Sequence, residues 1–182
     1  VVMITGVTLL GEVLDGWTGE GLGGVRVRLS GEQDAQTRTR ADGTFVLRQL
    51  PTGTYDVSLE HVDYENQSQR VVLEPPRYVD RPQEPDTVRL EPGGVIEGEV
   101  MDADQNLVAG AEVTWGEPPR WGEATRTDGR GQFRLRGVPE GVFWVTARHG
   151  RAGEDTSQEP VAVRPLETSP GVLIRLPDSS EE

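Results

Sequence analysis

The feature that most constrains this 182-residue chain is an internal repeat with a period close to 87 residues. The segment Gly11-Glu12-Val13-Leu14-Asp15 recurs 87 positions later as Gly98-Glu99-Val100-Met101-Asp102. A repeat of this length is one structural unit that occurs twice. The sequence therefore predicts two copies of one small domain rather than one large domain.

The similarity continues through the middle of each copy. Thr39-Arg40-Ala41-Asp42-Gly43 matches Thr125-Arg126-Thr127-Asp128-Gly129 at an offset of 86, and Phe45 matches Phe133 at an offset of 88. Offsets that change by a residue or two indicate insertions in loops between conserved strands. This alignment places the two additional residues of the second copy in its turn, at Arg130-Gly131.

Apolar and polar residues alternate within each copy, as at Val25, Val27 and Leu29 in the first. Alternation with a period of two indicates strands with one buried face, and the Asp-Gly pairs at 42–43 and 128–129 favour tight hairpins. No helical apolar pattern is free of internal Gly or Pro, so almost no helix is expected. The expected strands span 7–15, 24–30, 35–40, 44–49, 54–60, 68–73 and 86–90, then 95–102, 110–115, 121–127, 132–136, 142–148, 158–163 and 171–176.

About seven short strands per copy predict an all-β fold, with two tandem antiparallel Greek-key β-sandwiches. A hydrophobic content of 34% with only 5% aromatic residues suits two thin cores better than one large core. We expect domains at 1–92 and 93–182, with the boundary at Glu91-Pro92-Gly93-Gly94. The proline-rich stretch 74–85 is interpreted as a loop inside the first copy, with an interdomain linker as the alternative.

Charge and composition disfavour several functions. The formal charge of −13, from 31 acidic and 18 basic residues, repels nucleic acid and anionic membrane surfaces. All basic residues are Arg, so a lysine-based isopeptide crosslink is excluded, and the lack of Cys excludes disulfides and thiolate sites. The chain shows neither a signal peptide nor a membrane-spanning segment, and its abrupt start and acidic tail favour a fragment of a larger protein.

The order of motifs resembles the carboxypeptidase regulatory-like domain family, which has a transthyretin-like sandwich. The order is G-x-V, a Gly before the second strand, T-x-D-G, an aromatic residue, L/V-P-x-G and then Tyr or Phe, and it covers nearly the whole chain twice. Similar modules occur as collagen-adhesin B-type repeats on bacterial surfaces. The motif positions are Gly11, Val13, Gly24, Val25, Asp42, Gly43, Phe45, Leu50, Pro51, Gly53 and Tyr55, then Gly98, Val100, Gly110, Asp128, Gly129, Phe133, Val138, Pro139, Gly141 and Phe143.

These motif positions are turns and core residues, so the resemblance implies a fold rather than a chemistry. In metallocarboxypeptidases the module follows a zinc peptidase domain, whose His-x-x-Glu pair is missing here. The two histidines, His61 and His149, are equivalent under the repeat, which favours a structural role over a shared metal or acid–base site. Intradiol dioxygenases share a related sandwich, but Tyr55 lies on a core face and too few iron ligands remain.

A second candidate metal site is Asp102-Ala103-Asp104-Gln105-Asn106, which has the D-x-D-x-N start of a calcium loop. Leu107 stands where such a loop needs Gly, and the later glutamate is missing. We interpret this segment as a polar turn. No metal ion and no cofactor are expected.

The tryptophans suggest a ligand surface. Trp115 is in phase with Val113 and is expected in the core, whereas Trp144 is out of phase with its neighbours and should face solvent or another domain. Trp121 follows Pro118-Pro119-Arg120 in a loop, and Trp17 lies in the first turn. Exposed rings stack on sugars or on a partner's side chains, while packing between the two copies is the alternative explanation. Open strand edges are a further possible binding surface.

These observations predict a non-catalytic structural or protein-interaction module of a larger bacterial protein. It would act as a spacer or bind a protein partner, either other domains of the same protein or a surface or envelope complex. The family resemblance implies an extracytoplasmic location, in the periplasm or on the cell surface. The alternative is a carbohydrate-binding module that uses Trp144, Trp121 or Trp17 on a glycan, and a third possibility is a metal-dependent hydrolase or dioxygenase.

Overall fold

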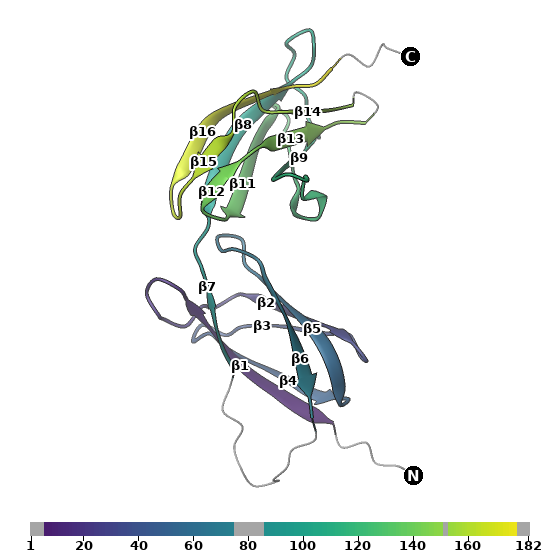
Figure 1. Ribbon diagram of the computed structural model, residues 1–182, viewed down its shortest axis with the longest axis vertical. Helices are drawn as coiled ribbons and strands as arrows, with labels where there is room; N and C mark the ends of the chain where they lie inside the picture. Colours follow the sequence, from purple (N-terminus) through teal and green to yellow (C-terminus); the bar gives the residue numbers. More distant parts are fainter. Residues whose placement is uncertain (1–5, 75–85, 151–152, 178–182) are drawn as a thin grey trace. The chain divides into compact units, whose positions relative to one another are not determined.

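The computed structural model describes residues 6–74, 86–150 and 153–177, and it divides into two compact units between Pro92 and Gly93 (Figure 1). The expected all-β class is confirmed, since the described residues form strands apart from one short 3-10 helix, η1 (Trp121–Glu123). No helix in the described part is long and apolar enough to span a membrane. Most of the expected proline-rich loop, the first five residues and the acidic tail lie outside the described residues.

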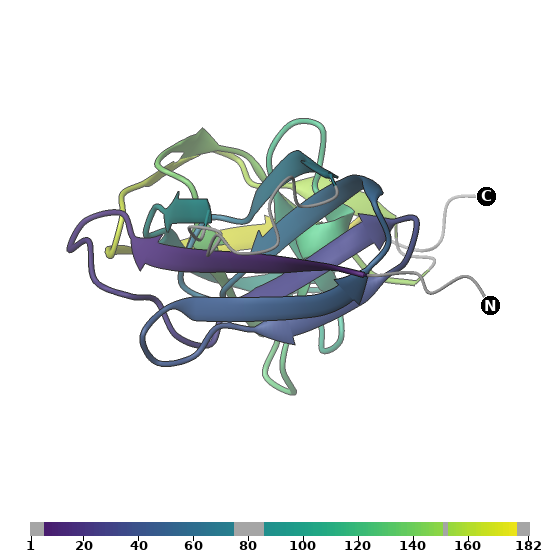
Figure 2. The ribbon, with the colours of Figure 1, turned by 90° about the horizontal axis from the view of Figure 1, so that it is seen from below.

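Unit 1, the first copy, is a sandwich of two sheets with strand orders β4-β1-β7 and β3-β2-β5-β6. Its first strand, β1 (Val7–Asp15), is the long purple strand in Figure 2. Apolar side chains of both sheets meet between them in one core. The other strands are β2 (Arg26–Gly31), β3 (Ala35–Arg38), β4 (Thr44–Leu50), β5 (Gly53–Glu60), β6 (Gln67–Leu73) and β7 (Asp86–Leu90).

Unit 2, the second copy, repeats this plan with shorter and more numerous strands. Its sheets have the orders β11-β8-β16 and β10-β9-β13-β14, with a separate pair β12-β15. A second core fills this sandwich. The strands are β8 (Gly94–Met101), β9 (Glu112–Trp115), β10 (Thr125–Arg126), β11 (Gln132–Val138), β12 (Gly141–Phe143), β13 (Val145–Arg148), β14 (Glu154–Thr156), β15 (Val161–Val163) and β16 (Thr168–Arg175).

The alternating pattern of the sequence produces the two cores. Val25, Val27 and Leu29 are at most 2% exposed, and their counterparts in unit 2, which include Trp115, are at most 3% exposed. The expected core position of Trp115 is therefore confirmed. The larger indole at the Leu29 position is accompanied by smaller alanines elsewhere in the core of unit 2, which keeps the core volume similar.

The last strand of each unit differs from the expected antiparallel pattern. β7 pairs with β1 in parallel, from Gly11↔Asp86 to Asp15↔Leu90, and β16 pairs with β8 in parallel. The other strand pairs are antiparallel. Because the first and last strands of each unit run side by side in one direction, the chain enters and leaves each unit at opposite ends.

The hairpin before the fourth strand corrects the sequence alignment. Gly43 has a φ of +82°, and the corresponding residue of unit 2 is Gly131, with a φ of +68°, rather than Gly129. The same bond closes both turns, from Gly43 N–H to Arg40 and from Gly131 N–H to Asp128. The two turns have equal length, so the prediction of two extra residues at Arg130-Gly131 was wrong.

The extra residues lie earlier, in the connection after the second strand. Arg26 pairs with Arg38 in unit 1, whereas Glu112 pairs with Arg126 in unit 2, and the second interval is two residues longer. The 116–124 loop contains the insertion, with η1 near its end. Only β10 forms a strand within the expected range 121–127, because η1 occupies the first three residues of that range.

Candidate functional site

The motif residues shared by both copies build the frame. The hydroxyl of Thr39 accepts the Val25 N–H at 2.9 Å and donates to the Leu22 carbonyl at 2.7 Å. Thr127 makes the same two bonds, to the Ala111 N–H and the Val108 carbonyl, at the same distances. Because these hydroxyls satisfy buried backbone groups, their role is structural.

The acidic motif residues close turns. The carboxylate of Asp42 accepts from the backbone N–H and hydroxyl of Thr44, and Asp128 accepts from the backbone N–H of Arg130 and of Gln132. These hydrogen bonds lower the pKa of both carboxyl groups below the ordinary value. Each carboxylate therefore holds its own loop.

The candidate calcium loop is a polar turn. Asp102 accepts the Asn106 N–H at 2.8 Å and its side-chain amide at 3.1 Å, and these bonds lower the pKa of Asp102. Gln105 takes a φ of +68°, the turn conformation. The described residues contain no group of three or more His, Cys, Asp or Glu side chains placed to hold a metal ion. The interpretation as a turn is confirmed.

The two histidines follow equivalent strands, as the repeat predicts. His61 comes directly after β5, where its ring lies edge-on to Tyr64 with centroids 5.0 Å apart, and its Nδ1 accepts the Asp63 N–H. His149 comes directly after β13 and is exposed. Each histidine therefore lies in its own unit, in a turn at the end of a strand.

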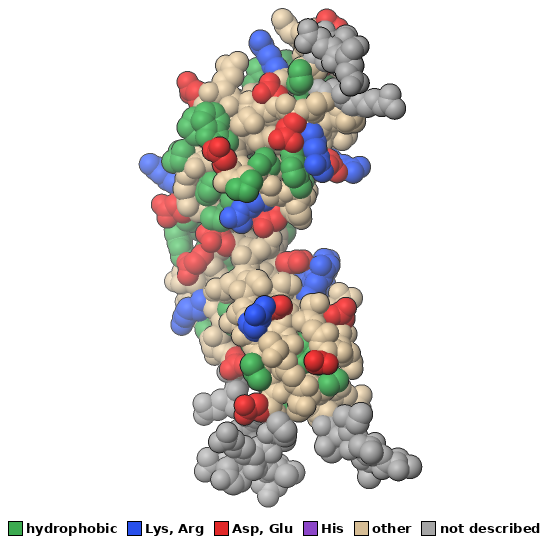
Figure 3. All heavy atoms as spheres, turned by 45° about the vertical axis from the view of Figure 1, so that its right-hand side comes forward, with side chains coloured by type: hydrophobic (Ala, Val, Ile, Leu, Met, Phe, Trp, Pro, Cys, Tyr) green, Lys and Arg blue, Asp and Glu red, His purple; other side chains and the backbone are tan. Residues whose placement is uncertain are grey.

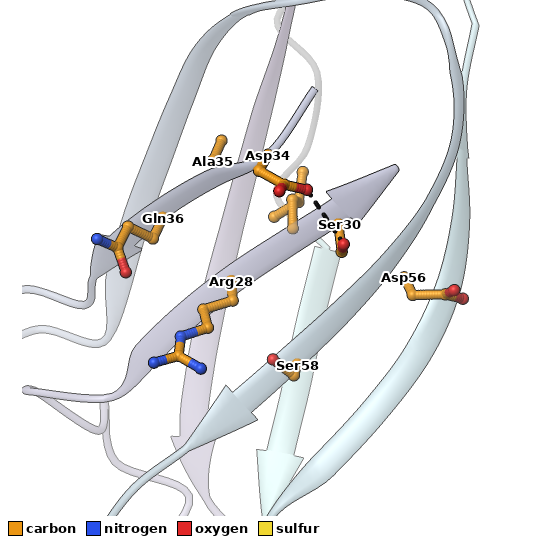
Figure 4. Close-up of a pocket in the computed structure, with 8 residues that line it drawn as sticks. Arg28, Ser30, Asp34, Ala35, Gln36, Asp56 and Ser58 are labelled. Atoms are coloured by element: carbon orange, nitrogen blue, oxygen red, sulfur yellow. Dashed lines mark hydrogen bonds between the residues drawn. The ribbon is translucent and has the colours of Figure 1, made fainter. Parts of the chain in front are cut away.

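The outer face of sheet β3-β2-β5-β6 in unit 1 is polar. It contains a hollow of about 530 Å³ over β2, β3 and β5 (Figure 4). Arg28 lies near Glu60 at 3.6 Å, and Asp56 pairs with Arg70 at 2.8 Å, which lowers the pKa of Asp56. Asp56 and Glu60 thus have cationic partners, and Asp34 accepts a hydrogen bond from the Ser30 hydroxyl at 3.1 Å.

The corresponding face of unit 2 is partly covered by the 116–124 loop. The hydroxyl of buried Thr114 donates to the Arg120 carbonyl at 2.7 Å and holds the loop down. Trp121 in this loop stacks on Arg148, whose guanidinium carbon lies 3.8 Å from the ring centroid. Arg148 in turn donates two hydrogen bonds to Glu112, at 2.9 and 2.8 Å. One face of Trp121 is therefore already occupied by an arginine of the same unit.

Trp144 occupies a break in the fifth strand of unit 2, which was expected to be continuous over 142–148. The strand divides into β12, paired with β15, and β13, paired with β9 and β14. The Trp144 carbonyl accepts the Gly116 N–H at 2.9 Å, and Ser157 bonds both backbone groups of Val145. These bonds replace the missing ladder pairs and stabilise the break.

A two-residue bulge explains this break. Two residues separate Ser68 and Val71, which pair with β5 in unit 1, whereas four residues separate Thr156 and Val161, which pair with β13 and β12. The additional residues lie within 157–160, and no strand can stay in register across them. The expected strand 158–163 accordingly forms only as β15.

A groove of about 540 Å³ surrounds Trp144, and we call it the Trp144 groove. Thr146 and Thr156 form its floor, with their hydroxyl oxygens 3.2 Å apart. Two exposed carboxylates, of Glu117 and Glu154, lie along it, while the carboxylate of Asp155, the next residue of β14, accepts the Thr156 N–H at 2.7 Å. The lining residues are Gly116, Glu117, Pro119, Trp144, Thr146, Glu154, Asp155, Thr156 and Ser157.

The three tryptophans named from the sequence therefore lie in different settings. Trp144 is half-buried in its groove, and Trp121 is half-buried over the same sheet, stacked on Arg148. Trp17 belongs to unit 1, where it is 62% exposed in the first turn. On the surface visible in Figure 3, acidic and basic side chains are interspersed. The stacking roles of these three residues stay predictions.

Sequence reasoning missed the acidic residues of the groove. Glu117, Glu154 and Asp155 are three of 31 acidic residues, and no motif distinguishes them. The signal that could have found them was the position of the two insertions of unit 2 relative to unit 1, because both inserted segments contribute residues to this groove. Misplacing the first insertion at Arg130-Gly131 hid that signal.

No curated protein matches this chain. Solved structures with a similar fold include the Bacillus anthracis TIE protein, at 17% identity and a TM-score of 0.42 over 93% of this chain and 34% of that chain. A Streptococcal ancillary pilin matches at 15% identity and a TM-score of 0.41, over 96% of this chain and 63% of the pilin. The Streptococcus agalactiae minor pilin GBS52 matches at 15% identity and a TM-score of 0.41, over 93% of this chain and 95% of the pilin.

This chain thus spans about a third of the length of the first of these proteins and under two thirds of the second. The model of the carboxypeptidase regulatory-like domain matches residues 8–81 and again residues 95–176. The two matches fall on the two copies of the repeat and cover most of the chain. The chain therefore belongs to the carboxypeptidase regulatory-like domain family and carries that domain twice.

Proposed function

We propose that this chain is a non-catalytic spacer of a larger extracytoplasmic bacterial protein, which keeps the parts before and after it apart. The observation that carries the proposal is the parallel pairing of first and last strands in both units. A unit whose chain enters at one end and leaves at the other adds its full strand length to the separation. For the nine residues of β1 that length is roughly 30 Å.

The same pairing resists force. Tension applied at the two ends of unit 1 pulls β1 and β7 in opposite directions along their common axis. The five residue pairs from Gly11↔Asp86 to Asp15↔Leu90 then share the strain and must break together. In unit 2, the residue pairs of β8 and β16, from Thr168↔Val95 to Arg175↔Met101, share the tension in the same way. Hairpin strands pulled apart from one end instead lose one pair at a time.

The non-catalytic part of the proposal rests on the use of the motif residues. Thr39, Thr127, Asp42 and Asp128 are engaged in holding turns. Polar groups committed to the frame have no free geometry with which to act on a substrate. The extracytoplasmic location is proposed from the family resemblance alone, and protease treatment of intact cells followed by fractionation tests it.

Single-molecule pulling tests the spacer. The chain has no cysteine, so introduced cysteines are unique attachment points. Handles at the two chain ends load both parallel pairs in shear. Handles at Arg26→Cys and Arg38→Cys, which pair across β2 and β3, peel the same unit open.

We expect end-to-end pulling to require a several-fold higher unfolding force than peeling, because unfolding under force follows the unfolding barrier. On the outer polar face Arg26 pairs with Glu60 and Arg38 donates to the Gly24 carbonyl, so the end-handle chain carries Arg26→Ser and Arg38→Ser, which leaves pulling direction as the difference. Equal forces in the two directions would contradict the spacer proposal.

A further inference from the structure

We propose that the Trp144 groove binds an arginine side chain presented by an extended segment of a partner protein. The spacer role does not require this groove, so the two proposals stand or fall separately. The groove combines an aromatic ring, two carboxylates and an adjacent strand edge within a single unit.

The first step of the argument is where unit 2 departs from unit 1. Unit 1 has Asp56 where unit 2 has Trp144 and Ser58 where it has Thr146, and its own hollow extends over β2 and β3 instead of along β6, the edge strand that corresponds to β14. Both two-residue insertions of unit 2, in 116–124 and 157–160, contribute to the lining of its groove. The frame needs neither insertion, as unit 1 demonstrates. Two additions that converge on one half-buried ring indicate a built surface.

The second step is charge. In unit 1, Asp56 pairs with Arg70, and in unit 2, Glu112 pairs with both Arg126 and Arg148. By contrast, Glu117, Glu154 and Asp155 form no ion pair with any residue that the structure describes. The carboxylates of Glu117 and Glu154 on one groove, without a cation of their own among the described residues, complement a positively charged ligand.

The third step is the tryptophan ring. In the same unit, Arg120 lies 4.5 Å from the centroid of Trp115 and Arg148 lies 3.8 Å from that of Trp121. Over the described part of unit 2, Trp144 is the tryptophan with no arginine on its ring. A planar guanidinium stacks on an indole and is attracted by its electron-rich face. The groove therefore offers an incoming arginine the contacts that two internal arginines already make.

The fourth step is the strand edge, which favours a protein segment over a free cation. β14 (Glu154–Thr156) is the last strand of its sheet, and β13 pairs with its inner side. An extended segment that adds to the outer side of β14 runs along the groove and brings every second side chain to the same face. The residues of β14 thus supply both the backbone groups for strand pairing and the Glu154 carboxylate.

The probe is a capped peptide, Gly-Thr-Arg-Thr-Gly, titrated into the full chain. Its matched control carries citrulline in place of arginine, which has nearly the same shape but no charge. We expect the indole N–H signal of Trp144 and the amides of β14 to shift with roughly millimolar affinity. The citrulline peptide should bind at least about fivefold more weakly, and added salt should weaken the arginine peptide.

Two variants test the groove itself. Trp144→Ala should remove binding, and Glu117→Gln combined with Glu154→Gln should weaken it by about tenfold. The charge-matched control is Glu20→Gln with Glu32→Gln, two exposed residues of unit 1, which should leave binding unchanged. If Trp144→Ala does not fold, the double glutamine variant still decides, because neither glutamate contacts the core.

Three results would overturn the proposal. The first is equal binding of the arginine and citrulline peptides, and the second is a shift pattern outside the Trp144 groove. The third is tighter binding of a neutral oligosaccharide such as cellotetraose at Trp144, which would make the groove a sugar site. Each of these results leaves the pulling experiment, and hence the spacer proposal, unaffected.

Discussion

The two units use the same hydrogen bonds to build their frames but different side chains on the outer face of their second sheet. Thr39 and Thr127 make identical pairs of bonds, and Gly43 and Gly131 occupy the same turn position. Both outer faces carry paired charges, and unit 2 adds an inserted loop, a broken strand and Trp144. The difference separates what the fold needs from what it leaves open.

The largest predicted effect concerns the glycines of the G-x-V motif. An added Cβ at Gly11 would lie 2.2 Å from the ring of Phe45, while at Gly98 it would lie 2.0 Å from the Val172 carbonyl and 2.7 Å from Phe133. A ring end can shift, whereas a carbonyl in the β8–β16 ladder cannot move without disrupting pairing. Gly11→Ala should cost about 2–3 kcal/mol and Gly98→Ala about 4 kcal/mol or more.

Hydrogen exchange read separately over each unit measures these free energies of unfolding, because one global value is not defined for two domains. Each variant should affect its own unit, and the other unit provides the control. A Gly11→Ala effect as large as that of Gly98→Ala would show that the two parallel ladders are equally rigid at this position.

The next effect tests whether the frames are equivalent. Thr39→Val and Thr127→Val each leave a buried backbone N–H and a carbonyl without their partner, which should cost about 2 kcal/mol in either unit. Thr→Ser at the same positions keeps the hydroxyl and should retain most of the stability. The losses of stability that urea unfolding measures for Thr39→Val in unit 1 and Thr127→Val in unit 2 should agree within about 0.5 kcal/mol. A larger difference between the two losses would mean that the frames differ.

The sequence predicted the frame well because the frame repeats. Strand alternation located β1 to its terminal residues, and the equivalence of His61 and His149 under the repeat agrees with their positions directly after β5 and β13. The hairpin alignment failed because the pair Asp128-Gly129 resembles Asp42-Gly43 in letters, whereas the backbone requires a positive φ one residue before the strand. That position belongs to Gly131.

The candidate site was harder to predict for a physical reason. Trp144 was identified from its phase, but its groove arises from insertions that break a strand and fold a loop over the sheet. Such insertions are tolerated because side chains on the outer face pack against few other residues. The insertions therefore leave no periodic pattern in the sequence. The acidic residues of the groove become recognisable only when the pairing of every strand is known.

A smaller effect separates the units by pH. In unit 1, Tyr64 donates to Asp15 at 2.5 Å, and burial together with this bond raises the pKa of Tyr64 to about 12. A raised phenol pKa contributes stability that is complete below pH 10 and is lost as the pH rises toward 12. The sequence of unit 2 has no tyrosine, so its stability should stay flat over this interval.

Tyr64→Phe should cost unit 1 about 1 kcal/mol at neutral pH and reduce its alkaline loss. At low pH the variant should also be less sensitive, since the Tyr64 hydroxyl is the main cause of the lowered pKa of Asp15, whose contribution disappears as the pH falls through that pKa. Thermal unfolding of each unit between pH 3 and 12 measures both trends. If the variant loses as much stability at high pH as the parent chain, the loss would be assigned to Tyr55, whose pKa is also raised by burial.

The smallest effect compares two surface arginines. Among the described residues Arg70 pairs with Asp56 alone, so Arg70→Gln should leave the stability of unit 1 nearly unchanged, as for most exposed pairs. Arg148 bonds Glu112 twice and also stacks on Trp121, so Arg148→Gln should lower the stability of unit 2 by more, though by less than Tyr64→Phe lowers unit 1.

The Arg148→Gln variant also distinguishes the two half-buried tryptophans of the outer face. Removing the guanidinium should shift the Trp121 indole signal and raise the pKa of Glu112 toward its ordinary value, because Arg148 is the main cause of its lowering. Trp144 lies four positions from Arg148, roughly 13 Å along the strand, and its signal should stay in place. If both signals move together, the inserted loop couples the two rings, and the outer face of unit 2 acts as one surface.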